Sequence, residues 1–178
     1  MLTVSDVYTL PDLLARAVNK HPDSDIVVFP ESKTTFAQLY ERATNAARSL
    51  KAIGINDGDS VGILMSNCIE FVDLLLGSQL IGAIPVPINA RYKAKELAYV
   101  IDDAGLKVLA TTDRIVEHVD FVELLQEAFP NLENQTDPMQ LQLPEARNLN
   151  SIILFGERMP VGMLDTETFE TLSENIEV

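Results

Sequence analysis

The chain has 178 residues, which is enough for one domain of ordinary size or one large subdomain of a bigger protein. Hydrophobic residues make up 47% of it, so a substantial core is expected and disorder is excluded as the main state. The formal net charge of −14 argues against a nucleic-acid partner, because phosphates would be repelled, and the single cysteine, Cys68, excludes a disulfide framework.

The chain has no apolar run long enough to span a bilayer, and its first residues lack the pattern of a signal peptide. One cysteine also fits a reducing compartment. We therefore expect a cytoplasmic protein without an integral membrane segment.

The first third of the chain predicts two helices and a strand. Residues 10–20 predict a helix and residues 25–29 a strand. The strongest helix prediction covers residues 36–53, where apolar side chains recur at a 3.6-residue spacing. Thr35 suits its N-cap, with Gln38 three residues later, as in a capping box.

Strands and helices continue to alternate along the rest of the chain. We expect Asn67 to cap the helix that follows the strand at 61–65. The other predicted elements are strands at 84–88, 106–110 and 151–155 and helices at 68–81, 94–104 and 120–129. This order predicts an α/β fold, a mostly parallel sheet with helices on both faces. The Asn-, Gln- and Pro-rich loop at 131–150 is interpreted as a surface excursion within one subdomain of residues 1–178.

The stretch "LIGAIPVPINARYKAKELAYVI" combines two prolines with three cations, Arg91, Lys93 and Lys95. An anion site, a membrane contact and a purely structural strand are all open interpretations of it. Prolines cannot donate to a sheet ladder, so Pro85 and Pro87 favour an edge strand whose other side stays free to pair. Cations ahead of a helix N-terminus gain nothing from the helix dipole, which weighs against the anion site.

Three pieces of sequence, in order, resemble one known family. "TTFAQL" resembles its early Thr-Tyr-x-x-Leu element, "GINDGDSVGILMSNCIEF" its Gly-Val-x-x-Gly-Asp-x-Val stretch, and "SQLIGAIPVPIN" its Lys-Ala-Gly-Ala-x-x-Val-Pro-Asn element. Over residues 34–112 the chain thus resembles the N-terminal part of the AMP-forming acyl-CoA synthetases, within the adenylate-forming superfamily. The resemblance implies the N-terminal subdomain of that fold.

The resemblance also implies a reaction. The full-length enzyme would activate a carboxylic acid, foremost a fatty acid, with ATP and Mg²⁺, and would transfer the acyl group to coenzyme A. The family does this with a Thr-Ser-Gly-rich phosphate loop and a Lys in a C-terminal lid, and neither pattern occurs here. We therefore expect an N-terminal fragment that ends before the phosphate loop, binds none of these cofactors and is inactive alone.

Partners follow from the same resemblance. The fragment would pack against the remainder of its own chain, and an exposed apolar face would favour self-association. The family's coenzyme A contacts come from arginines just after the strand that matches "LKVLATT", where this chain has Arg114 alone and not a pair. Arg114 is thus the one candidate site residue, and its alternative is an ordinary surface arginine.

Two alternative functions are considered for the chain as a whole. A natural short chain could serve as a non-catalytic interaction module, whereas a small nucleotide-binding protein would need a glycine-rich strand-to-helix turn that is missing.

His21 and His118 lie far apart without a cysteine nearby, which argues against a metal site. Cys68 starts a predicted helix and is either a reactive thiol or, as we expect, an inert one.

Overall fold

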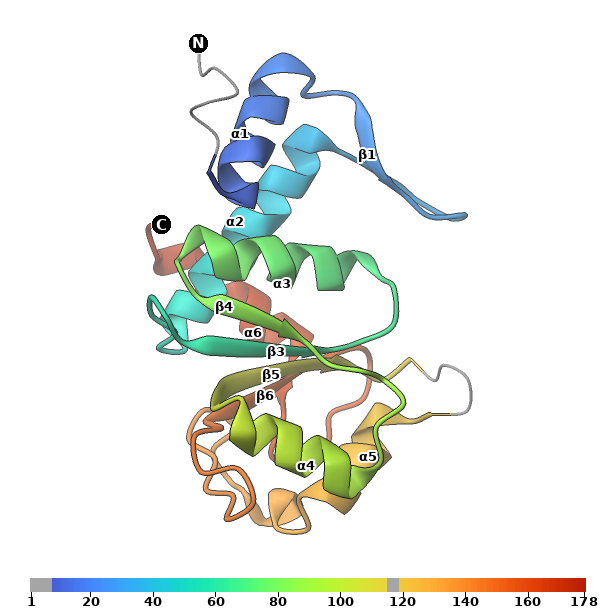
Figure 1. Ribbon diagram of the computed structural model, residues 1–178, viewed down its shortest axis with the longest axis vertical. Coiled ribbons are helices and arrows are strands. Elements are labelled where there is room, and N and C mark those ends of the chain that lie inside the picture. Colours follow the sequence, from blue (N-terminus) through green and yellow to red (C-terminus); the bar gives the residue numbers. More distant parts are fainter. Residues whose placement is uncertain (1–7, 115–118) are drawn as a thin grey trace.

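The computed structural model describes residues 8–114 and 119–178 and contains a parallel sheet between two helical layers (Figure 1). The sheet strands are β3 (Ser60–Leu64), β4 (Ile84–Pro87), β5 (Leu106–Thr112), β6 (Ser151–Phe155) and β7 (Leu164–Asp165). Their spatial order is β4-β3-β5-β6-β7, and each neighbouring pair is parallel. The predicted fold class is confirmed.

Helices cover both faces of this sheet (Figure 1). The helices of the described residues are α1 (Leu10–Lys20), α2 (Phe36–Ala52), α3 (Ile69–Leu80), α4 (Ala94–Asp103), α5 (Phe121–Ala128) and α6 (Thr166–Thr171), with short 3₁₀ turns η2 (Leu132–Asn134) and η3 (Leu172–Asn175). Of these, α1 lies away from the sheet and packs on α2 and α3. On one face, α2, α3 and α6 enclose a core that includes Leu50, Leu74 and Phe169. On the other face, α4 and α5 enclose a second core around Leu97 and Phe121.

The two prolines form an edge strand, as predicted. Pro85 and Pro87 lie in β4, which pairs only with β3 at one end of the sheet order. The N–H groups that flank the prolines point to β3: Ile84 donates to the Asp59 carbonyl at 2.8 Å, and Ile88 donates to the Ile63 carbonyl at 2.9 Å. Each proline thus stands where its missing N–H would face away from the sheet.

Of the two predicted helix N-caps, Thr35 is confirmed and Asn67 is not. Thr35 accepts the Gln38 N–H at 3.3 Å, and Gln38 Oε1 accepts the Thr35 N–H at 2.9 Å, so the predicted capping box is confirmed. The prediction for Asn67 is wrong, because α3 has Cys68 at its N-cap position, without a side-chain capping bond. The buried thiol packs there, and the polar cap is lost.

The strand near residue 25 does not join the main sheet. β1 (Asp25–Val28) pairs antiparallel with β2 (Lys33–Thr35) in a separate hairpin, which the sequence did not predict as such. Val27 and Phe36 pack with α1, α2 and α3 in a third core. The short β7 was also not predicted, because two paired residues leave no periodic pattern.

The segment 131–150 is irregular apart from η2, but it is more than a surface excursion. Its apolar side chains are buried in the core beneath α4 and α5; they are Leu132, Leu141, Leu143, Ala146 and Leu149. The Asn150 N–H also donates to the Lys107 carbonyl at 2.8 Å, which fixes the segment to β5. The sequence did not predict this burial, because polar residues separate these apolar side chains and leave no periodic pattern.

We predict that Gly77→Ala destabilises the fold even though alanine is the better helix former. A Cβ at residue 77 would lie 2.8 Å from the Ala43 carbonyl oxygen and 3.0 Å from the Ala46 Cβ, so α2 and α3 would have to separate. We expect the free energy of unfolding, measured by urea denaturation, to fall by about 1–3 kcal/mol. Glu41→Ala, on the exposed side of α2, is the control and should change it by less than about 0.5 kcal/mol.

Candidate functional site at the carboxyl end of the sheet

A cavity of about 260 Å³ lies between α2, α3, β6 and α6. Two aromatic rings form its apolar wall: the Phe155 and Phe169 centroids are 5.6 Å apart and their planes meet at 81°, an edge-to-face arrangement. Its polar lining brings together charged groups from α2, α3 and α6. These are Arg42, Glu70, Asp73 and Glu170.

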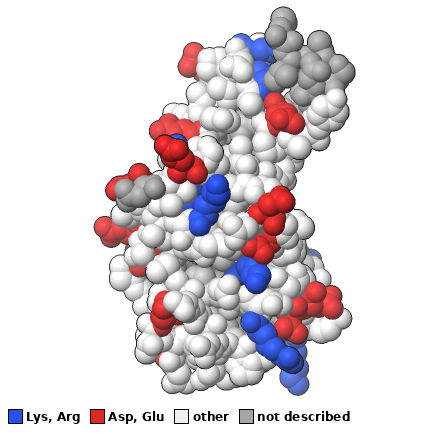
Figure 2. All heavy atoms as spheres, turned by 90° about the vertical axis from the view of Figure 1, so that its left-hand side faces the viewer, with Lys and Arg blue, Asp and Glu red and all other residues white. Residues whose placement is uncertain are grey.

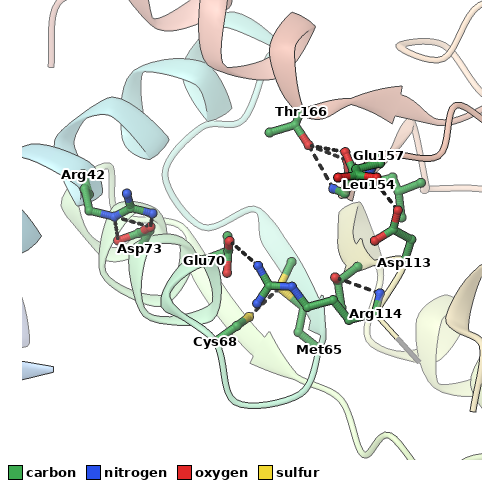
Figure 3. A network of polar contacts seen from close by, with 12 residues as sticks. Arg42, Met65, Cys68, Glu70, Asp73, Asp113, Arg114, Leu154, Glu157 and Thr166 are labelled. Carbon is green, nitrogen blue, oxygen red and sulfur yellow. Dashed lines mark hydrogen bonds and ion pairs between the residues drawn. The ribbon is translucent and has the colours of Figure 1, made fainter. Parts of the chain in front are cut away.

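Arg42 and Asp73 form a two-pronged ion pair across the α2–α3 contact (Figure 3). Arg42 Nη2 lies 2.6 Å and Nε 2.9 Å from Asp73 Oδ2. The Asp73 side chain is only 9% exposed, whereas that of Arg42 is 44% exposed. The pKa of Asp73 is raised to about 6. Burial is the largest cause, the Arg42 guanidinium opposes it, and the charges of Glu70 and Glu170 add to it.

A second ion pair lies at the rim of the cavity. Arg114 follows β5, and its Nη2 lies 3.1 Å from Glu70 Oε1. The backbone N–H of Arg114 donates to the Thr112 hydroxyl at 3.2 Å. The other Glu70 oxygen, Oε2, is buried and has no hydrogen-bond partner among the residues described. The Arg114 side chain remains 58% exposed, so its guanidinium can still reach solvent.

The loop after β6 is held by the carboxylate of Asp113, which follows β5 (Figure 3). Asp113 Oδ2 accepts the backbone N–H groups of Glu157 at 2.7 Å and Arg158 at 3.0 Å. A Cβ at Gly156 would clash with the Asp113 carboxylate, so a side chain there would displace that carboxylate from these hydrogen bonds. The Arg158 guanidinium pairs with Asp120, the N-cap of α5, at 2.6 Å. The loop after β6 is therefore fixed to the end of β5 and to the start of α5.

The other single-residue predictions have simple outcomes. Cys68 is 4% exposed, and burial raises the pKa of its thiol to about 11, as expected for an inert thiol. His21 is exposed at the end of α1, whereas His118 lies outside the described residues. Within the described ranges, no group of three His, Cys, Asp or Glu side chains could hold a metal ion.

The described residues also do not fit the phosphates of a nucleotide. A phosphate loop needs a glycine-rich turn from the carboxyl end of a strand into a helix. The glycines with positive φ lie instead at helix ends or before strands; they are Gly54, Gly58, Gly82, Gly105 and Gly162. Gly58 belongs to the tight turn "INDGD", as expected.

Comparison with protein-family models gives a match over residues 14–157 to the family described as AMP-binding enzyme. The chain belongs to this family. The acyl-CoA ligase SID4 of Ajellomyces capsulatus is 31% identical over 175 residues, which cover 93% of this chain and 29% of that protein. The long-chain-fatty-acid–CoA ligase FadD13 of Mycobacterium tuberculosis is 42% identical over 77 residues, or 43% of this chain and 15% of FadD13.

Solved structures agree with this membership in the AMP-binding family. The anthranilate CoA ligase AuaEII, in complex with anthranoyl-AMP, superposes with a TM-score of 0.76 at 25% identity, over 96% of this chain and 30% of that one. The N-terminal domain of FACL13 from Mycobacterium tuberculosis shares the fold, with a TM-score of 0.68 at 23% identity, over 96% of this chain and 37% of that one. The fold is that of the N-terminal subdomain of adenylate-forming enzymes, and this chain spans less than a third of SID4 and AuaEII.

The Arg42–Asp73 pair was not predicted from the sequence, although one signal was present. Asp73 is the only charged residue in the apolar run "FVDLLLGSQL", and a carboxylate in such a helix needs a partner when it is buried. Nothing in the sequence identified Arg42 as that partner. A site role for Arg114 stays a prediction, and the structure adds its pairing with Glu70.

We predict a distinctive pH dependence for Asp73→Asn. Because the folded pKa of Asp73 is raised to about 6, the folded chain retains a proton that the unfolded chain releases from about pH 4 upward. The stability of the parent relative to Asp73→Asn should therefore fall by roughly 1–3 kcal/mol as the pH rises from about 4 to about 7. Urea denaturation across that range measures it, with the exposed Asp23→Asn as control; a pH-independent difference would contradict the prediction.

Proposed function

We propose that this chain is the N-terminal subdomain of a fatty-acid–CoA ligase. The complete protein would join a carboxylate oxygen to the α-phosphorus of ATP, which breaks the α–β phosphoanhydride bond and releases pyrophosphate. The thiol of coenzyme A would then displace AMP from the acyl carbonyl, giving a thioester. The observation that carries the proposal is the AMP-binding family match over residues 14–157, and the FadD13 name favours a fatty acid over an aryl acid.

The part that we assign to this chain is structural. At the carboxyl end of its sheet, Asp113, Arg114 and Arg158 are engaged within the chain, and the glycines with positive φ form no strand-to-helix phosphate turn. This supports the binding of ATP and Mg²⁺ by another part of the protein. The chain alone would then be inactive and would pack against the remainder of its own sequence. We place this activity in the cytoplasm; no helix in residues 8–114 and 119–178 is long and apolar enough to cross a membrane.

We propose that nucleic acid is no partner of this chain, whose formal net charge is −14. On the one face that Figure 2 shows, both basic and acidic side chains lie at the surface. A nucleic-acid interface would instead show cations gathered along one surface. The partner that we propose for this subdomain is protein, from the same chain.

The proposal predicts where catalysis resides. We would express the 178-residue chain and, separately, the complete reading frame that contains it, and measure acid-dependent ATP–pyrophosphate exchange and thioester formation with fatty and aryl acids. The complete protein should catalyse both reactions, with fatty acids preferred, whereas the short chain should give only background. Activity of the short chain would overturn our assignment of its role. A complete frame that ends at Val178, or that is inactive, would favour a non-catalytic interaction module.

Arg114→Ala tests the coenzyme A assignment in the complete protein. If the exposed Arg114 guanidinium contacts a coenzyme A phosphate, its removal should raise the KM for coenzyme A about tenfold and leave ATP–pyrophosphate exchange unchanged. Arg147→Ala, another exposed arginine, is the matched control. Equal KM values in the two variants would identify Arg114 as a surface arginine that only pairs with Glu70.

A further inference from the structure

The outer face of α4 carries a shallow hollow of about 390 Å³ beside two tyrosines. The inner face of this helix is buried through Ala94, Leu97 and Ile101. On the outer face Tyr99 is 67% exposed, although a ring of this size is usually covered over much of its area. Figure 1 shows α4 at the surface of the molecule with no other element in front of it. The hollow is lined by Tyr92, Lys95, Glu96, Tyr99 and Val100.

Four of the five charged residues at α4 are placed against the helix dipole, and Glu96 in the first turn is the exception. Lys93 and Lys95 stand at the amino end, and Asp102 and Asp103 stand at the carboxyl end; all four are exposed. Helices favour the opposite arrangement, because their amino ends are partly positive and their carboxyl ends partly negative. Neither Lys95 nor Asp102 forms an ion pair within the part of the chain that the structure describes.

This arrangement is self-complementary. A helix turns about 100° per residue, so Lys95 and Asp102, seven residues apart, lie on the same flank of the exposed stripe, with Tyr99 near its centre. An antiparallel copy of the same helix would bring the basic end of one α4 to the acidic end of the other. It would also place each charged helix end beside the opposite end of the partner helix, whose dipole offsets the unfavourable charge–dipole interaction within each copy.

The opposite flank of the stripe weakens such contact without matching the attraction between Lys95 and Asp102. It carries Glu96 and Asp103, whose like charges would approach each other across the same interface. Glu96 is turned back to accept the Lys93 N–H at 2.9 Å, and Asp103 accepts the Tyr99 hydroxyl at 3.4 Å. Both carboxylates are thus engaged within their own helix, whereas Lys95 and Asp102 are available to a second molecule.

We propose that the outer face of α4 docks a second copy of this chain, antiparallel, around a twofold axis beside Tyr99. Lys95 of each copy then faces Asp102 of the other, and the two Tyr99 rings cover the hollows beside them. A twofold contact uses the same patch on both molecules, and this patch matches itself in charge and in apolar surface. One ten-residue helix is a small interface, so the association is weak and depends on concentration.

A charge swap tests this contact. Sedimentation velocity of the 178-residue chain across a range of concentrations should show a monomer–dimer equilibrium. Lys95→Glu or Asp102→Lys alone sets like charges opposite each other twice and should raise the dimer Kd about tenfold or more. The double variant K95E/D102K restores opposite charges and should return the Kd to within about threefold of the parent value.

Matched controls separate this contact from the general charge of the chain. Lys51→Glu and Asp23→Lys change the net charge by the same amounts at exposed positions elsewhere and should leave the Kd unchanged. Tyr99→Cys should form a disulfide between copies on oxidation, whereas the parent should not, because Cys68 is buried. A chain that stays monomeric at every concentration would overturn the proposal. So would a dimer that K95E weakens no more than K51E does.

Discussion

The close approach of α2 and α3 is the contact on which one whole layer of the molecule depends. At Gly77 the two helices come so near that there is no room for a single methyl group beside the Ala43 carbonyl. α3 lies against the sheet, and α2 is held above it by this contact. α1 and the β1–β2 hairpin pack in turn on α2 and α3, and η3 packs on α2, so a wider spacing would displace all of them.

The same contact explains the chemistry of the Arg42–Asp73 pair. Because α2 covers α3 so closely, the Asp73 carboxylate has little access to water, and desolvation raises its pKa even beside a guanidinium. A buried pair of this kind adds little net stability compared with apolar packing, but the loss of one partner leaves an uncompensated charge. Its two-pronged geometry also favours one register of α2 on α3, since a slip of either helix would separate the two groups.

How far the sequence predicts this structure depends on whether the signal is local. The α2 capping box, the edge prolines and the alternation of strands and helices were readable, because each rests on neighbouring residues and on backbone rules. The β1–β2 hairpin, the buried leucines of segment 131–150 and the partner of Asp73 were not. The hairpin is local, but its strands have only four and three residues, too few for a clear periodic pattern. The other two depend on contacts between segments that are distant in sequence, and in segment 131–150 polar residues lie between the buried ones. The pairing of Arg114 with Glu70 was hidden for the same reason.

That pairing uses one nitrogen of the Arg114 guanidinium, Nη2, and its other donors can still reach an anion. A phosphate that draws the guanidinium away from Glu70 would leave both oxygens of that carboxylate without a partner, since Oε2 already lacks one among the described residues. The uncompensated charge would stand at the rim of the cavity that holds Asp73, whose pKa Glu70 already raises. The charge of Glu70 thus acts on two arginine–carboxylate contacts, its own with Arg114 and the neighbouring Arg42–Asp73 pair. The α3 helix, which carries both carboxylates, is the physical link between the rim and the α2–α3 contact.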